Sequence, residues 1–137
     1  MANINRVKTD LVKEVDGTWV DFILGIRLKI ARSRNAKYNE MIRNLTENMR
    51  IDMRDGKFDT EGFNEVLVQV RAHTILLDWE NVDEDGVEIP YSPEKAMQYF
   101  RDPELKDFYT FVVAISESAE AYKKDLVKES EKNLPSS

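Results

Sequence analysis

Apolar and polar residues alternate along residues 20–30. The odd positions include Asp21, Gly25, Arg27 and Lys29, whereas every even position is apolar: Val20, Phe22, Leu24, Ile26, Leu28 and Ile30. Because successive side chains of a β-strand point to opposite faces, this period of two predicts a half-buried strand with the even residues in the core. We expect Gly25 to bend or bulge the ribbon and to split it into two short strands.

The residues before this ribbon also favour β structure. Residues 11–15 read LVKEV, which is strand-like, and Asp16-Gly17 follows them directly. An Asp-Gly pair tolerates the positive φ angles of a tight hairpin turn, so it is a strong short-range hairpin signal. We therefore predict a β-hairpin or a three-stranded meander over residues 9–31.

After Ser33 the period changes to that of an amphipathic helix. The first helix is predicted over residues 34–53, and Asp55-Gly56 should end it. Its apolar stripe consists of Tyr38, Met41, Ile42, Leu45, Met49 and Met53. Asp59 or Thr60 can then cap a second helix that ends near Trp79. The stripe of this second helix consists of Phe63, Val66, Leu67, Val70, Thr74 and Leu77.

Two further helix starts carry clear capping signals. Ser92-Pro93-Glu94 combines an N-cap side chain, a proline at the first helical position and an acid in the first turn. Asp102-Pro103-Glu104 repeats the arrangement, and we expect it to begin a long helix. The inward face of this helix is predicted to hold Leu105, Phe108, Tyr109, Val112, Ile115, Ala119, Tyr122 and Leu126. From Lys123 onward the sequence becomes highly charged.

Together these elements predict an α+β fold: an N-terminal β-hairpin or three-stranded meander packed on about four α-helices. The length of 137 residues suits a single domain over residues 1–137, since one core typically occupies roughly 100–200 residues. We expect residues 1–8 and 130–137 to be flexible, residues 9–31 to form the β ribbon and residues 34–133 to be helical.

Composition narrows the class of protein. No apolar run approaches the roughly 20 residues of a membrane helix, and the N-terminus lacks the apolar core of a secretory signal, which predicts a cytoplasmic protein. The chain has no cysteine, so disulfides and thiolate metal sites are excluded. The net charge of −6 disfavours a general nucleic-acid binder. The charge is unevenly distributed, because residues 27–43 are basic and residues 78–88 are acidic.

Residues 81–92, NVDEDGVEIPYS, partly resemble a calcium-binding loop. Asn81, Asp83 and Asp85 occupy the first, third and fifth positions, and Gly86 occupies the sixth. The twelfth position, which needs a bidentate carboxylate, holds Ser92 instead, and Pro90 interrupts the loop. We therefore predict a turn at Asp85-Gly86, an extended step and a helix cap, with no metal site.

Catalytic signals are weak throughout the sequence. His73 is the only histidine and lies on an apolar helix stripe, which is typical of a packed histidine. There is no glycine-rich phosphate loop and no nucleophile elbow. The sequence therefore predicts a protein that is not an enzyme, with no catalytic residues and no cofactor, and that acts by interaction.

Two interaction classes remain open at this point. The basic stretch 27–43 could contact nucleic acid, with Tyr38 stacking on a base. Tyr38 falls on the apolar stripe of a helix, however, which favours a protein surface as the target of these cations. The predicted partner-binding residues are Trp19, Ile23, Arg27 and Lys29, on the outward face of the β ribbon. An exposed ribbon edge also predicts self-association into a homo-oligomer.

Residues 76–105, LLDWENVDEDGVEIPYSPEKAMQYFRDPEL, resemble the signature of phage tail assembly chaperones. The shared elements are a Trp that closes a helix, an acidic turn with Gly, an apolar-Pro-aromatic step and two capped helix starts. In this chain the signature residues are Trp79, Gly86, Pro90, Tyr91 and Ser92, for which we expect structural roles. Residues 19–42, WVDFILGIRLKIARSRNAKYNEMI, are also similar to the family, so the resemblance covers residues 19–122.

The resemblance implies a protein of the host bacterial cytoplasm that is absent from the mature virion. It would bind the tape measure protein and tail tube subunits by non-covalent contacts only. Neither a membrane nor a nucleic acid is expected as a partner. The alternatives are a nucleic-acid-binding regulator that uses residues 27–43 and a minor structural tail component. The resemblance also implies exposed apolar surface, because a tape measure is a long, largely apolar chain that aggregates before tube subunits cover it.

Overall fold

The computed structural model describes residues 1–54 and 59–124. Its α-helices are α1 (Leu11–Asp16), α2 (Ala36–Arg54), α3 (Thr60–Thr74), α4 (Pro93–Arg101) and α5 (Lys106–Glu117). Its strands are β1 (Thr18–Asp21), β2 (Arg27–Ile30), β3 (Leu76–Glu80), β4 (Asp83–Glu84) and β5 (Val87–Glu88). Short 3-10 helices are η1 (Ile4–Val7), η2 (Ile23–Gly25), η3 (Pro103–Leu105) and η4 (Glu120–Tyr122). The predicted α+β fold is confirmed.

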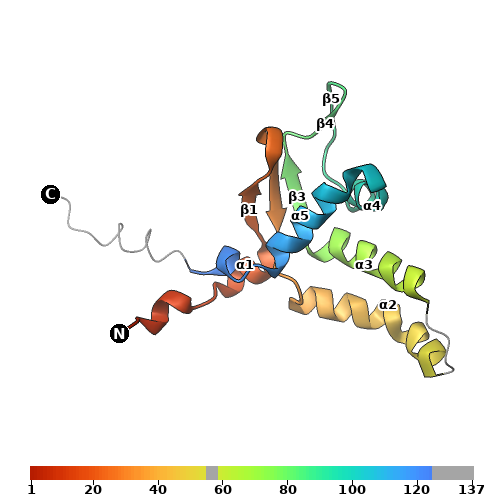
Figure 1. Ribbon diagram of the computed structural model, residues 1–137, viewed down its shortest axis with the longest axis horizontal. Helices are drawn as coiled ribbons and strands as arrows, with labels where there is room; N and C mark the ends of the chain where they lie inside the picture. Colours follow the sequence, from red (N-terminus) through yellow and green to blue (C-terminus); the bar gives the residue numbers. More distant parts are fainter. Residues whose placement is uncertain (55–58, 125–137) are drawn as a thin grey trace.

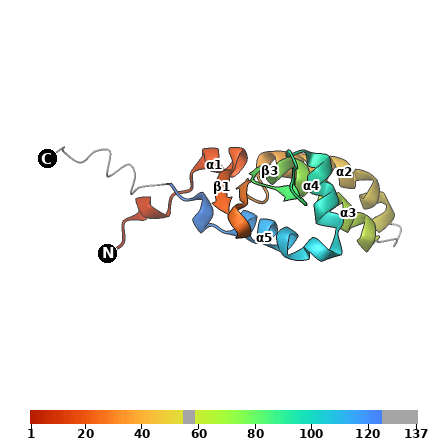
Figure 2. The same ribbon diagram turned by 90° about the horizontal axis from the view of Figure 1, so that it is seen from above.

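The main sheet is antiparallel, with strand order β1-β2-β3. Figure 1 shows the sheet at the centre, with β1 at its left edge and β3 on the right, and α2 and α3 extending away together. In the view from above, α5 runs along one side of the molecule and α4 lies between α5 and the α2–α3 pair (Figure 2). β4 and β5 form a separate small hairpin.

The inner face of the sheet carries the core that the alternation predicted. Leu28 and Ile30 are fully buried, and Val20, Phe22 and Ile26 pack against the same core. The helices complete it with fully or nearly fully buried side chains, among them Tyr38, Val68, Val70, Phe100, Phe108 and Val112. Burial of such apolar side chains stabilises a fold by about 1.5–3 kcal/mol each.

The predicted strand at residues 11–15 is wrong, because this segment is helix α1. Asp10 caps it: its side chain accepts hydrogen bonds from the backbone N–H groups of Val12 and Lys13, at 3.0 and 3.2 Å. Gly17 follows the last helical residue with φ 83°, a positive angle that glycine adopts without steric cost. Asp16-Gly17 therefore ends a helix instead of forming a hairpin turn, and residues 9–31 are only partly a β ribbon.

The second predicted helix ends earlier than expected. α3 begins at Thr60 with Asp59 as its cap, as predicted, and ends at Thr74. Leu76–Glu80 then forms β3, which pairs with β2, so that Leu28 lies opposite Trp79. The expected helical segment 34–133 thus contains the third strand of the sheet. Trp79 does not close a helix but lies buried on this strand.

The capping prediction is confirmed for Ser92 and only in part for Asp102. Asp102 caps the 3-10 turn η3, whereas the long helix α5 begins later, at Lys106, without a side-chain cap. Ser92 Oγ accepts from the Lys95 N–H at 3.0 Å, and the Asp102 side chain accepts from the Glu104 N–H at 2.9 Å. α2 begins at Ala36 and ends at Arg54, within two residues of the prediction, whereas Asp55-Gly56 lies outside the described residues.

The last helix is shorter than predicted. α5 ends at Glu117, and Tyr122 is buried from the separate turn η4. The predicted inward residue Ala119 is exposed, and Leu126 lies outside the described part of the chain. Within residues 1–54 and 59–124, no helix is long and apolar enough to span a bilayer.

Candidate partner-binding surface

The two strands of the β1–β2 hairpin are joined by an exposed apolar turn. Leu24 and Gly25 have φ angles of 59° and 79°, and the Ile26 N–H donates to the Ile23 carbonyl oxygen at 3.1 Å. This is the geometry of a type I′ turn, which matches the twist of antiparallel strands. We call Ile23, Leu24 and Gly25 the hairpin tip. Asn81 braces it, because its side-chain amide donates to the Gly25 carbonyl oxygen at 3.0 Å.

Leu24 is energetically unfavourable at the hairpin tip. It is 91% exposed and has φ 59° and ψ 27°, a left-handed conformation that costs an L-residue about 1–2 kcal/mol. Asn, Asp or Gly normally fills this turn position. Backbone strain of this kind, combined with an exposed apolar side chain, is typical of functional positions. Ile23 beside it is 62% exposed.

The prediction that Leu24 faces the core is wrong. The alternation placed it inward, but the chain reverses direction at Leu24 and Gly25, so the inner face is interrupted there. Gly25 was correctly predicted to split the ribbon, and it does so by completing a hairpin turn. The signal available in the sequence was Gly25 itself, because Gly suits the second central position of a two-residue hairpin turn.

The outward face of the sheet brings together three of the four predicted partner-binding residues. Trp19 lies opposite Lys29, and Arg27 lies opposite Asp21. The Arg27 guanidinium lies 5.3 Å from the centre of the Trp19 ring and contacts Asp21 at 3.2 Å and Glu80 at 3.5 Å. Trp19, Arg27 and Lys29 are half-buried, whereas the fourth residue, Ile23, lies on the hairpin tip.

A second exposed apolar surface lies at the N-terminus. Within residues 1–12, which we call the N-terminal arm, the exposed large apolar residues are Met1, Ile4, Val7, Leu11 and Val12. The arm projects from the body beside α1, away from α2 and α3 (Figures 1 and 2). Sequence reasoning missed this surface. The signal was the spacing of Met1, Ile4, Val7 and Leu11, which follows a helical period.

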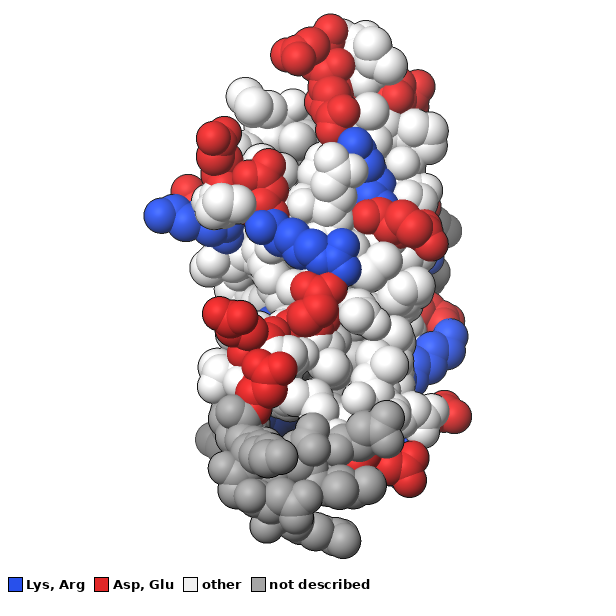
Figure 3. All heavy atoms as spheres, turned by 90° about the vertical axis from the view of Figure 1, so that its right-hand side faces the viewer, with Lys and Arg blue, Asp and Glu red and all other residues white. Residues whose placement is uncertain are grey.

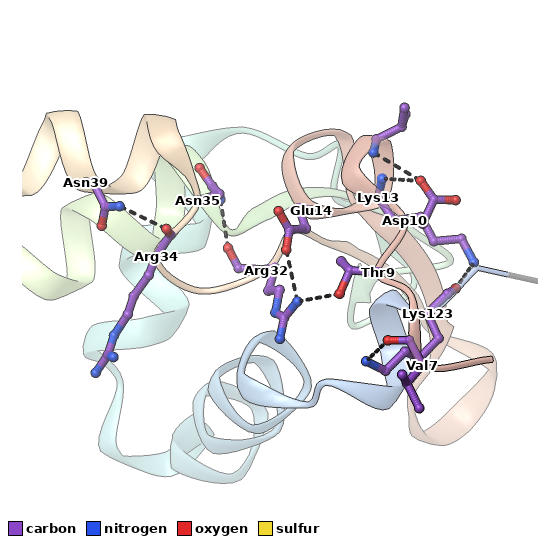
Figure 4. A network of polar contacts seen from close by, with 11 residues as sticks. Val7, Thr9, Asp10, Lys13, Glu14, Arg32, Arg34, Asn35, Asn39 and Lys123 are labelled. Atoms are coloured by element: carbon purple, nitrogen blue, oxygen red, sulfur yellow. Dashed lines mark hydrogen bonds and ion pairs between the residues drawn. The ribbon is translucent and has the colours of Figure 1, made fainter. Parts of the chain in front are cut away.

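Polar contacts anchor the base of the N-terminal arm (Figure 4). Arg32 donates to Glu14 at 2.9 Å and to Thr9 at 3.4 Å, and the Lys123 ammonium donates to the Val7 carbonyl oxygen at 2.8 Å. Thr9 also pairs with Lys123 in an isolated antiparallel bridge. The arm is therefore held at its base while its apolar side chains remain exposed.

Two of the six cations in the basic stretch 27–43 form ion pairs within the protein. Arg27 pairs with Asp21 and Glu80, and Arg32 pairs with Glu14. Tyr38 is only 8% exposed, so its ring is not accessible for stacking on a base. On the face shown in Figure 3, a band of basic groups lies between acidic groups above and below it. That face therefore presents mixed charge.

Trp79 organises the segment that carries the resemblance. Its indole Nε1–H donates to the Ile89 carbonyl oxygen at 2.8 Å, and its ring meets Tyr91 edge to face and stacks on Tyr99. The Tyr91 hydroxyl lies 2.9 Å from the Ala72 carbonyl oxygen and 2.5 Å from that of Leu76. Burial raises the pKa of Tyr91 to about 12. Pro90 is exposed between these anchored neighbours.

The acidic turn carries internal contacts. Asp85 and Gly86 have φ angles of 52° and 90°, and the Gly86 N–H donates to Asp83 at 3.1 Å. Glu84 pairs with Lys95 at 3.0 Å and accepts from the Tyr99 hydroxyl at 2.9 Å. These two donors lower the pKa of the Glu84 carboxyl, with Lys95 the larger cause. In the described part of the chain, no three His, Asp or Glu residues are grouped in a way that could hold a metal.

A groove of about 510 Å³ lies between α3, α4 and α5. Of the cations that line it, Arg71 donates to the Tyr109 hydroxyl at 2.8 Å and Arg101 forms a bidentate pair with Glu65. Arg101 lowers the pKa of Glu65 mainly through this hydrogen bonding. These two guanidinium groups are already engaged, so the groove offers less free positive charge than its residue types suggest.

Comparison with family models gives a match over most of the chain. The family model described as YdaY prophage protein matches residues 33–133. No curated protein and no solved structure matches the chain. The matched region begins after β2, so it includes the segment organised by Trp79 but neither the hairpin tip nor the N-terminal arm.

Proposed function

The chain belongs to the YdaY prophage protein family, and from this premise we propose that it is a phage tail assembly chaperone. It would bind the tape measure protein and tail tube subunits in the host bacterial cytoplasm and be absent from the mature virion. The resemblance of residues 76–105 to tail assembly chaperones supports this reading. The observation that carries it is the strained and exposed Leu24 on the hairpin tip.

Large apolar side chains are left uncovered at the hairpin tip and along the N-terminal arm. Leu24, Ile23 and the apolar side chains of the N-terminal arm expose large apolar groups to water at a cost to solubility. An apolar partner such as a tape measure segment would recover about 25 cal/mol for each Å² of apolar surface that it covers. Because this contact is non-directional and non-covalent, tube subunits can displace it without nucleotide hydrolysis.

The outward face of the sheet would add polar contacts beside the hairpin tip. Trp19 offers a half-buried aromatic ring, with the Arg27 guanidinium over it and Lys29 opposite Trp19 on the neighbouring strand. Trp and Arg are enriched at the energetically important positions of protein interfaces. We therefore assign Trp19, Ile23, Leu24, Arg27 and Lys29 to the partner-binding surface.

The test is co-expression with the tape measure protein of the same prophage. The wild-type chain should raise the soluble fraction of the tape measure protein severalfold, and the double variant Ile23→Thr/Leu24→Asn should lose most of that effect. The matched control is Val87→Thr, because Val87 is also an exposed apolar residue of a hairpin, 66% exposed, but lies away from the tip. If the wild-type chain has no effect on solubility, the proposal is wrong.

The two alternatives give different results. A minor structural tail component would be found by mass spectrometry in purified virions, whereas the chaperone should be absent from them. A nucleic-acid-binding regulator would bind DNA or RNA with an affinity that falls steeply as salt rises. The internal pairing of Arg27 and Arg32 supports the chaperone over this regulator.

A further inference from the structure

The outer edge of β1 has unused backbone hydrogen-bonding groups. In the β1–β2 hairpin the Phe22 N–H donates to the Ile26 carbonyl oxygen at 2.8 Å. Antiparallel pairs alternate along a ladder, so the backbone groups of Val20 also point toward β2, and those of Trp19 and Asp21 point away from it. Among the described residues no partner accepts from or donates to these outward groups of Trp19 and Asp21.

The opposite edge of the sheet is closed by side chains. On β3 the Trp79 N–H points outward, and the carboxylate of Asp78 accepts from it at 2.8 Å. The Tyr91 hydroxyl lies within hydrogen-bond distance of the Leu76 carbonyl oxygen on the same strand. An occupied edge cannot template another strand, which is a common protection against edge-to-edge pairing. The sheet is thus protected at β3 and open at β1.

The β1 edge also lacks the usual protective residues. Its sequence, Thr18 to Asp21, contains no Pro and no Lys, and Figure 1 shows no helix or strand of residues 1–54 and 59–124 beside the strand on its outer side. Its charged residue is Asp21, whose side chain is 86% exposed while it contacts Arg27. The edge therefore combines free backbone groups with an exposed carboxylate and a neighbouring aromatic ring.

We propose that this edge pairs with the β1 edge of a second copy of the chain, antiparallel and centred on Val20. In this register Trp19 of one copy lies opposite Asp21 of the other, and each such pair can exchange two backbone hydrogen bonds. The two three-stranded sheets then join into one continuous sheet. The partner is a second copy because the side chains along β1 complement one another in this register.

The complementarity follows from the register of the outward face. Asp78, Lys29 and Trp19 form one row across the sheet, and Asp21, Arg27 and Glu80 form the next. When two copies pair about Val20, the row that ends at Trp19 in one copy continues into the row that begins at Asp21 in the other. The exposed carboxylate of Asp21 then lies beside the Trp19 ring of the second copy, over which an Arg27 guanidinium already lies at 5.3 Å. The carboxylate of Asp21 and the guanidinium of Arg27 carry opposite charges, and their attraction favours this register.

A shifted register is less favourable. Moving the pairing toward the hairpin tip would place the two Asp21 carboxylates opposite each other, and like charges in that position destabilise a sheet. Moving it the other way would bring Gly17, which ends α1, into the ladder. The Val20-centred register avoids both problems.

The test compares two substitutions at Asp21. Asp21→Pro removes the outward N–H but leaves the bonds between β1 and β2, because those use Val20 and Phe22. Asp21→Ala removes the same carboxylate and retains the N–H. Sedimentation equilibrium across a wide concentration range should show a wild-type dimer, a dimer weakened severalfold in Asp21→Ala, and a monomer in Asp21→Pro. Near-ultraviolet circular dichroism of each variant checks that the fold is retained.

Amide hydrogen exchange tests the geometry directly. The Trp19 and Asp21 amides should become protected as the wild-type concentration rises, whereas the Val20 and Phe22 amides should be protected at every concentration. A chain that is monomeric throughout the concentration range overturns the proposal. So does a dimer that Asp21→Pro leaves intact, or protection of Trp19 and Asp21 that requires another protein. The chaperone test can succeed or fail independently of the dimer, because it changes Ile23 and Leu24 and measures the solubility of the tape measure protein.

Discussion

The indole Nε1–H of Trp79 donates a 2.8 Å hydrogen bond to the carbonyl oxygen of Ile89. This bond closes the base of the hairpin formed by β4, β5 and the acidic turn, because Trp79 precedes that hairpin and Ile89 follows it. The Ile89 N–H also donates to the Val82 carbonyl oxygen at 2.9 Å. The segment is thus fixed at its base by one buried side chain.

Trp79→Phe should therefore lower the free energy of unfolding by about 1–3 kcal/mol, because it leaves the Ile89 carbonyl oxygen without its donor in a partly buried site. Urea unfolding followed by far-ultraviolet circular dichroism measures this. The matched control is Trp19→Phe, which removes an indole that donates no hydrogen bond to the described residues and should cost less. Equal losses in the two variants would contradict this account of Trp79.

Replacing Leu24 should stabilise the protein. Leu24→Asn places a residue that tolerates φ 59° at a position where Leu is strained, and Asn-Gly is the preferred pair for this turn. We expect a gain of about 1 kcal/mol in the free energy of unfolding, seen as a higher midpoint in thermal unfolding. Ile23→Asn, at a residue without positive φ, should give no gain. A loss of stability in Leu24→Asn would show that the turn is not strained.

Stability should fall in alkaline solution. Burial raises the pKa of Tyr91 and of Tyr99 to about 12, and also raises that of Tyr122. The unfolded chain ionises its tyrosines near pH 10, so the stability due to the neutral phenols is complete below that pH and is lost as the pH rises toward 12. Urea midpoints measured across this range should fall, and Tyr91→Phe should fall less steeply than wild type. A midpoint that rises with pH would contradict the pKa directions.

Asp78 should protect the β3 edge from aggregation. Asp78→Ala exposes the Trp79 N–H at that edge, and we expect faster growth of light scattering during incubation of concentrated protein. Asp78→Asn is the control, because its side-chain oxygen can still accept from the same N–H although the charge is lost. If both variants aggregate at the same rate, the charge of Asp78 protects the edge and its hydrogen bond to the Trp79 N–H does not.

The sequence predicts best those elements that depend on neighbouring residues. Ser92 caps α4 as expected, and Asp102 caps the turn η3 that precedes α5, because capping needs only a side-chain oxygen and the N–H groups of the next turn. The alternation of residues 20–30 likewise locates β1 and β2, since Leu28 and Ile30 are fully buried. Helix α1 could also have been predicted, because Asp10 and Gly17 are its start and stop signals.

β3 is harder to predict because its structure depends on a distant partner. Leu77 and Trp79 continue the apolar character of α3, and no Gly or Pro separates the two elements. The segment becomes a strand by pairing with β2, a contact that no local signal reports. The candidate partner-binding surface could likewise be predicted only in part from local sequence. The outward residues Trp19, Arg27 and Lys29 follow from the alternation, but the exposure of Leu24 depends on where the chain reverses.

The pairing of Ile30 with Leu76 has a consequence for how the chain is made. Residues 31–75, which include the α2–α3 pair, must be synthesised before β3 can join the sheet. A contact across such a separation in sequence pays loop-closure entropy and forms slowly unless the intervening helices bring its ends together first. While Leu76 is still inside the ribosome, the edge of β2 that will pair with β3 has no partner strand. The nascent protein therefore passes through an interval in which it is itself prone to the aggregation that a chaperone prevents.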